Sequence, residues 1–286
     1  MAGSHGPPGE ESARERPRKA VERSALFRTR AGLLAGGLAG SGLRRRLDGH
    51  DRSEEAGMRS RFPRWLAGTA VERYVLDFEA RIEKAVSEFA GGLPTGGLVL
   101  DAGAGEGRHR THFPRQRYVA VDLAVGDAEW DYGRLDAVAD LRALPFRDAV
   151  FDACLNIVTL EHIPDPAAAL AEIARTLKPG GKLLLAAPQE WEIHQAPHDY
   201  YRFTRHALAA LLQQAGFAAF RIEAAGGFFR LLARRCLNSL QFFPAPLWPL
   251  AAAVFVPLGL ALPALDFLDR ERNFTLGYLC FAEKQP

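Results

Sequence analysis

The sequence predicts an α/β fold in which a doubly wound sheet carries helices on both faces. Short apolar runs, suited to buried strands, alternate along the chain with segments whose apolar residues recur at helical spacing. Polar residues follow several of these runs where a strand would end, which is where ligands bind in such sheets. A composition of 48% hydrophobic residues over 286 suits one large domain with appendages.

The expected elements follow one another from residue 65 to residue 283. Apolar runs predict strands at 98–100, 118–121, 136–138, 151–158, 182–187, 217–224 and 274–283. Helical spacing predicts helices at 65–89, 167–177 and 205–215. We interpret Lys178–Lys182, which reads Lys-Pro-Gly-Gly-Lys, as a turn before the fifth strand.

The first sixty residues differ in composition from the rest of the chain. Residues 1–30 are rich in Arg, Glu, Pro and Ser, which is typical of disorder. An apolar run at 31–43 ends in an arginine triplet and differs from a secretory signal in position and glycine content. We expect a disordered extension over 1–60 and one domain over 61–286 with its core at 97–224. Translation starting at Met58 is an alternative.

Charge and cysteine content narrow the function classes. A net charge of +2 gives no global attraction to nucleic acid. The three cysteines, Cys154, Cys236 and Cys280, lie far apart and lack the spacing of metal ligands. We therefore expect buried thiols in a reducing cytoplasm, with no disulfide framework and no metal site.

A glycine-rich run follows the first expected strand. Asp101 ends the strand, and Gly103, Gly105 and Gly107 follow at alternate positions. Glycine lets the backbone turn tightly and admits a ligand close to the main chain. An acid at the strand end can accept hydrogen bonds from cationic or hydroxyl groups. In dinucleotide-binding loops the third glycine stands one residue later, which disfavours a nicotinamide-dependent dehydrogenase.

The pattern Asp-x-Gly-x-Gly-x-Gly resembles the first motif of class I S-adenosylmethionine (SAM)-dependent methyltransferases, and later segments extend the resemblance over residues 97–223. It implies a Rossmann-like seven-stranded sheet and SAM as cofactor. Asp122 would bind the ribose hydroxyls, Asp140 the adenine amino group and the Leu141 amide the ring. The implied cofactor-binding residues are Asp101, Gly103, Gly105, Asp122, Leu123, Asp140, Leu141 and Asn156. A solvated loop acid at Asp122 and a helix cap at Asp140 are the structural alternatives.

A histidine-rich run at 188–204, after the fifth strand, is the candidate acceptor side. It resembles a His-x-x-Pro-x-Asp-Tyr-x-Arg-Phe-Thr segment of one branch of small-molecule-type methyltransferases. His194 and His198 from this run, with His162 near the end of the fourth strand, are candidate catalytic residues. A structural role is the alternative for each. We expect Arg202 to pair with Asp199, and Thr204 to cap the next helix.

An uncharged run at 236–265 forms the centre of a hydrophobic insertion at about 230–268, before the last strand. Its length permits a transmembrane helix. A single crossing would, however, place two neighbouring strands on opposite sides of a bilayer. Five prolines also divide the run into pieces too short to span. A lid, a dimer face and a membrane-surface contact remain open.

Taken together, these patterns predict a SAM-dependent methyltransferase that moves a methyl group to a small or lipid-like acceptor by in-line displacement. Oxygen is the expected acceptor atom, with carbon or nitrogen as alternatives. A catalytically silent SAM-binding or membrane-associated module is the alternative function. No nucleic-acid partner is expected, because no Asn/Asp-Pro-Pro-Tyr tetrapeptide follows the fourth strand. We expect a cytoplasmic protein with peripheral contact at the inner face of the membrane. The oligomeric state is not predicted.

Overall fold

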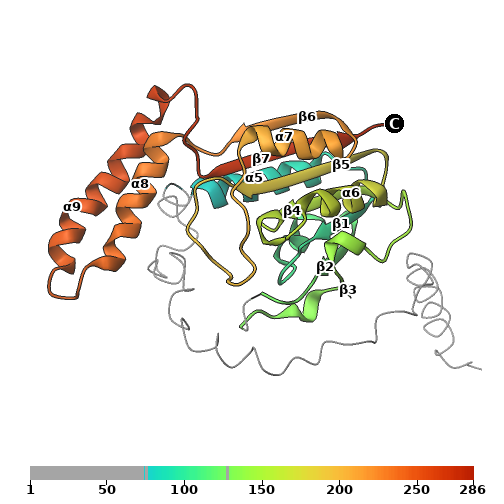
Figure 1. Cartoon of the computed structure of the whole chain (residues 1–286), viewed down its shortest axis with the longest axis horizontal. Coiled ribbons are helices and arrows are strands. Elements are labelled where there is room, and N and C mark those ends of the chain that lie inside the picture. Colours follow the sequence, from blue (N-terminus) through green and yellow to red (C-terminus); the bar gives the residue numbers. More distant parts are fainter. Residues whose placement is uncertain (1–73, 75–76, 127–128) are drawn as a thin grey trace, which may run out of the picture.

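The computed structural model describes Tyr74, residues 77–126 and residues 129–286 (Figure 1). The expected disordered extension and the alternative start at Met58 lie outside the described residues. So does most of the first half of the helix expected at 65–89.

A seven-stranded sheet forms the centre of the protein, in the order β3-β2-β1-β4-β5-β7-β6. The strands are β1 (Leu98–Ala102), β2 (Arg117–Asp122), β3 (Ala137–Val138), β4 (Phe151–Ile157), β5 (Leu177–Pro188), β6 (Phe217–Ala224) and β7 (Gly277–Lys284). β7 pairs antiparallel with β5 and β6, whereas the β1–β2, β1–β4, β2–β3 and β4–β5 pairs are parallel. The predicted doubly wound fold is confirmed.

Helices cover both faces of this sheet, with an apolar core on each. On one face α6 (Pro166–Thr176) and α7 (Arg205–Gln214) pack on the strands; on the other lies α5 (Asp77–Gly91). Successive side chains of a strand point to opposite faces. Accordingly Leu183 and Leu185 of β5 enter the first core and Leu184 enters the second.

Short 3-10 helices make the connections on the β3 side of the sheet. They are η2 (Arg108–His112), η3 (Tyr132–Arg134), η4 (Leu141–Ala143) and η5 (Leu160–His162). The expectation of a turn at Lys178–Lys182 was wrong, because these residues belong to β5. Gly180, at φ +72°, absorbs the irregularity, and the pairing with β4 shifts register between Phe151 and Ala153.

The hydrophobic insertion forms a helical hairpin beside the sheet (Figure 1). It consists of α8 (Phe228–Ser239), η6 (Leu240–Phe242), α9 (Trp248–Ala261) and η7 (Leu262–Leu268). The expectation that prolines would break this run was wrong. Pro249 and Pro263 lie in first turns, which need no amide donor, and α9 continues through Pro257. Residues Trp248–Leu268 are long and apolar enough to cross a membrane, at a mean hydropathy of 1.9, with 22% buried in the protein.

Arginines at the base of α8 dock the hairpin onto α5. The Arg234 side chain is only 5% exposed; it pairs with Glu79 at 3.0 Å and lies 4.1 Å above the ring of Trp191. Arg230 pairs with Asp77 at 3.2 Å. A buried charge is stable only when it is paired, so these contacts fix where the hairpin leaves the domain.

Arg234→Ala should lower the free energy of unfolding by about 3 kcal/mol, because it leaves the Glu79 carboxylate without its partner in a mostly buried place. The matched control is Arg235→Ala. Arg235 pairs with Glu192 at 3.0 Å, but both side chains are more than a third exposed. Its removal should cost at most about 1 kcal/mol. Urea denaturation of the two variants gives the comparison, and equal losses would contradict the docking role of Arg234.

Candidate functional site

The candidate site lies at the carboxyl ends of β1 and β4, where the strand order reverses. Such a reversal opens a crevice in doubly wound sheets. Side chains from β4 and the loop after it tie the two strand ends together. The Asn156 amide donates to the Ala102 carbonyl at 2.8 Å, and the Thr159 hydroxyl donates to the Gly103 carbonyl at 3.1 Å.

Two positions in the loop after β1 require glycine. Gly103 has φ +88°, and a Cβ there would lie 2.2 Å from Cγ2 of Thr159. Gly105 has φ +52° and packs on Trp130. Side chains at both positions would be strained and would fill the loop. Because Gly103 and Gly105 have no side chains, a ligand can approach the main chain of this loop closely.

Two buried oxygen atoms beside this loop have no hydrogen-bond partner within the described part of the chain. They are Oδ1 of Asp101 and Oδ1 of Asn156, both on fully buried residues. The other oxygen of Asp101 accepts a hydrogen bond from the Tyr118 hydroxyl. Burial raises the pKa of Asp101 to about 7, although the Tyr118 hydrogen bond works in the opposite direction. Unpartnered acceptors of this kind suit a ligand with an ammonium or hydroxyl group.

Asp122, at the end of β2, lies against the glycine loop, as the sequence predicted. Its carboxylate accepts hydrogen bonds from the amides of Gly105, at 2.9 Å, and Ala124, at 2.8 Å. Leu123 follows it and is 46% exposed. Asp122 is thus no free loop acid, because it holds the conformation of the loop. Its bond to ribose remains a prediction.

Asp140 takes the structural alternative that the sequence left open. It caps η4 by accepting a hydrogen bond from the Arg142 amide at 2.9 Å, and it pairs with the Arg142 guanidinium at 2.7 Å. This pairing lowers the pKa of Asp140. Leu141 behind it is buried. The contact of this pair with adenine also remains a prediction.

The loop after β5 brings the three predicted histidines to the end of β4. His162, in η5, packs edge-on against His194 with ring centroids 4.7 Å apart. Its Nδ1 lies 2.7 Å from the His198 carbonyl. Burial lowers the pKa of His162 to about 4, so the ring is neutral near pH 7. The His198 ring points to Tyr200, with Nδ1 3.3 Å from its hydroxyl.

The predicted ties within this loop are confirmed. Arg202 binds both carboxylate oxygens of Asp199, at 2.6 and 2.8 Å. It also donates to the carbonyls of Trp191 and Glu192. The Thr204 hydroxyl caps α7 by accepting from the Ala207 amide. Arg202 therefore shapes the loop, which is the role the sequence favoured.

Glu161 is the residue that the sequence reasoning missed. Its side chain is wholly buried, and neither carboxylate oxygen has a hydrogen-bond partner among the described residues. Burial raises the pKa of Glu161 to about 8. Its position next to His162, near the end of a strand, was the feature of the sequence that could have indicated a functional role. Its burial beneath a distant loop was not visible in the sequence.

Comparisons with known proteins agree with this geometry. A family model described as a methyltransferase domain matches residues 100–185. Malonyl-acyl-carrier-protein O-methyltransferase from Hahella chejuensis is 33% identical over 43% of this chain and 50% of its own length. Ubiquinone biosynthesis O-methyltransferase from Xylella fastidiosa is 33% identical over 53% of this chain and 75% of its own length. The chain thus spans about half the length of the first of these relatives and three quarters of the second.

Among solved structures, phosphoethanolamine N-methyltransferase 2 from Haemonchus contortus, in complex with phosphomonomethylethanolamine and S-adenosylhomocysteine, covers 75% of this chain. The match covers 56% of that chain, at 19% identity and a TM-score of 0.47. The family itself follows from the sequence relatives, and the bare glycine loop with its buried acceptors fits the cofactor that the family uses. The chain belongs to the SAM-dependent methyltransferases.

Proposed function

We propose that the protein transfers a methyl group from SAM to an oxygen atom of a small or lipid-like acceptor. The observation that carries this proposal is the meeting of the glycine loop and the histidine-rich loop at one end of β1 and β4. SAM supplies a methyl group already activated on a positively charged sulfur. The acceptor oxygen bonds to the methyl carbon as the carbon–sulfur bond breaks and the sulfur keeps the electron pair, and the hydroxyl proton passes to solvent. The protein's part is alignment and exclusion of water.

The cofactor end of the site would be held by residues on three strand ends. Asp101 and Asn156 offer their unpartnered oxygens to the amino acid part of SAM. Asp122 binds the ribose hydroxyls, and Asp140 with Leu141 meets the adenine. The three histidines, His162, His194 and His198, face the acceptor. His162 is neutral near pH 7, so its ring offers a lone pair rather than a charge.

An oxygen acceptor is supported by the two relatives, which are both named as O-methyltransferases. A lipid-like acceptor is supported by the hairpin. Exposed apolar side chains recur every fourth residue along α9, at Leu250, Val254 and Leu258, and Phe242 at the turn is 78% exposed. Arg234 and Arg235 link α8 to Trp191 and Glu192 of the acceptor loop.

We further propose that this hairpin contacts one leaflet at the inner face of the membrane. The topology argues against a single crossing of the membrane. β6 and β7 flank the hairpin in sequence and pair in one sheet, so the chain must return to the side it left. α8 docks on α5 through Arg234 and cannot form a second span. Shallow insertion of the α9 face into one leaflet would cover its apolar stripe.

Binding of SAM should release protons at pH 6. The ligand's amino group is already protonated there, whereas Asp101, with a pKa of about 7, is mostly neutral. A bound ammonium favours the carboxylate, so affinity should rise above pH 6, peak between the pKa of Asp101 and that of the ligand's amino group, about 8, and fall as the amino group loses its proton. Calorimetry in two buffers of different ionisation enthalpy measures the release. Asp101→Asn should abolish it, and proton uptake at pH 6 by the wild type would contradict the role of Asp101.

Turnover is tested with methyl-labelled SAM and separate lipid and aqueous extracts of cells. Label should pass to an organic-soluble product made from the lipid extract, and Asp122→Ala should lower the rate at least about 100-fold. Transfer only to water-soluble molecules would contradict the lipid-like acceptor. Tight SAM binding without transfer to any fraction would favour the catalytically silent module.

Flotation with vesicles of phosphatidylethanolamine and phosphatidylglycerol tests the membrane contact. Wild type should float with the vesicles, and the triple variant Leu250→Glu/Val254→Glu/Leu258→Glu should stay in the unbound fraction. Val138→Glu is the matched control, since Val138 is 65% exposed in β3, away from the hairpin. A wild type that stays unbound and sediments as a dimer, which the triple variant disperses, would identify the hairpin as a dimer face instead.

A further inference from the structure

Two clusters within the described residues bring together two histidines and one glutamate. One consists of Glu83, His109 and His112; the other consists of Glu161, His162 and His194. In each, one potential ligand atom per residue lies within 4.8 Å of the others. Both have the ligand types that bind divalent transition-metal ions. Because the ligand types are the same, the hydrogen bonds of each cluster decide which of the two could bind an ion.

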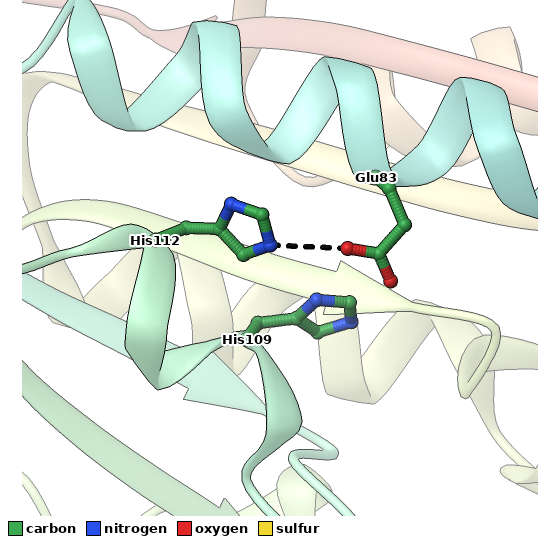
Figure 2. Close-up of side chains that lie close together, drawn as sticks. All are labelled: Glu83, His109 and His112. Carbon is green, nitrogen blue, oxygen red and sulfur yellow. Dashed lines mark hydrogen bonds and ion pairs between the residues drawn. The ribbon is translucent and has the colours of Figure 1, made fainter. Parts of the chain in front are cut away.

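Two nitrogen atoms of the first cluster are already engaged in hydrogen bonds. His112 Nε2 and Glu83 Oε2 lie 3.0 Å apart, at hydrogen-bond distance, as Figure 2 shows. The Arg108 guanidinium donates to Nε2 of His109 at 3.3 Å, which places a positive charge beside the ring. Because these nitrogens already have hydrogen-bond partners and a guanidinium lies beside one of them, a metal ion is disfavoured here. This cluster joins α5 to η2 and serves below as the control.

The second cluster has the opposite pattern. Both oxygens of Glu161 and Nε2 of His162 are buried without a hydrogen-bond partner in the described part of the protein. Glu161 Oε1 and His162 Nε2 are 3.7 Å apart, too far for a hydrogen bond. Two ligands held about 2.1 Å from one ion, at an angle somewhat above tetrahedral, are separated by this distance.

The tautomers of the histidines support a cation at this place. A carbonyl oxygen only accepts, so Nδ1 of His162 donates to His198, and Nε2 is left with a lone pair. Nδ1 of His194 lies 3.1 Å from the Glu192 carbonyl and 3.5 Å from the Arg202 guanidinium, and the shorter contact favours the tautomer in which Nδ1 donates to the carbonyl. Histidines that bind metals typically donate their second nitrogen to such a carbonyl. The lone pair of His162 and the carboxyl group of Glu161 therefore face each other at 3.7 Å, and neither has a hydrogen-bond partner among the described residues.

The charged groups that act on Glu161 largely cancel. They are Arg202 and Asp199, which bind each other through two hydrogen bonds. The cluster also lies near the glycine loop, because Thr159, two residues before Glu161, bonds to Gly103. A cation bound there would stand on the acceptor side of the cofactor site.

We propose that Glu161, His162 and His194 bind a divalent transition-metal ion. Its role rests on the proposed function: the ion holds the acceptor oxygen and lowers the pKa of that hydroxyl. The proton passes to solvent, and the oxygen then takes the methyl group as the carbon–sulfur bond breaks. The proposal departs from the expectation of no metal site, which considered only the spacing of the cysteines.

Zinc ion is the probe. Metal-stripped wild type should bind one Zn²⁺ per chain, measured by calorimetry and elemental analysis. Glu161→Gln and His194→Asn should each weaken binding more than about 100-fold, because each removes a ligand. The control pair Glu83→Gln and His112→Asn should bind as the wild type does. His194 lies in a loop, so His194→Asn keeps the test valid if the buried Glu161→Gln fails to fold.

Absence of Zn²⁺ binding by the wild type would overturn the proposal, as would loss of binding only in the Glu83 and His112 variants. SAM affinity, measured on the same samples, separates this outcome from failure of the proposed function. SAM binding without Zn²⁺ binding contradicts the metal site alone. Zn²⁺ binding without SAM binding contradicts the proposed methyl transfer and leaves the metal site in place.

Discussion

The close approach of Gly103 to Thr159 is the constraint on which the rest of the site depends. It brings the loop after β1 against the segment after β4, at the point where the strand order reverses. Any side chain at Gly103 would displace Thr159, and Thr159 stands two residues before Glu161. The cofactor loop and the acceptor-side cluster are thus positioned by one contact. A substitution in either loop should therefore alter the conformation of the other.

A second chain of contacts links the acceptor side to the hairpin. Arg202 holds the loop after β5 in shape by binding Asp199 and two carbonyls. The same loop supplies Trp191, under the guanidinium of Arg234. Arg234 in turn fixes α8 to Glu79. The apolar hairpin is therefore built onto the wall of the candidate site, and this arrangement supports an acceptor that arrives from a lipid surface.

Local patterns predicted most of the fold and the place of the residues around the glycine loop. Buried strands, the glycine loop, Asp122 at its strand end and the Thr204 cap are encoded within a few residues each, so spacing alone finds them. Glu161 could not be found in this way, because its burial depends on a loop about thirty residues further along the chain. The prediction that prolines would interrupt the segment now seen as α9 was wrong. The helix continues through Pro257, and two residues later Gly259 packs closely against Leu237 of α8.

Calorimetric titration with SAM tests the central claim most directly. The account predicts that wild type binds SAM and its demethylated product, and that Asp122→Ala weakens both about 100-fold through loss of the ribose contact and of the loop's support. Asp148→Ala, at a carboxylate 70% exposed and far along the chain from the loop, should bind as wild type does. Undetectable binding by the wild type, or equal affinity of Asp122→Ala, would contradict the account.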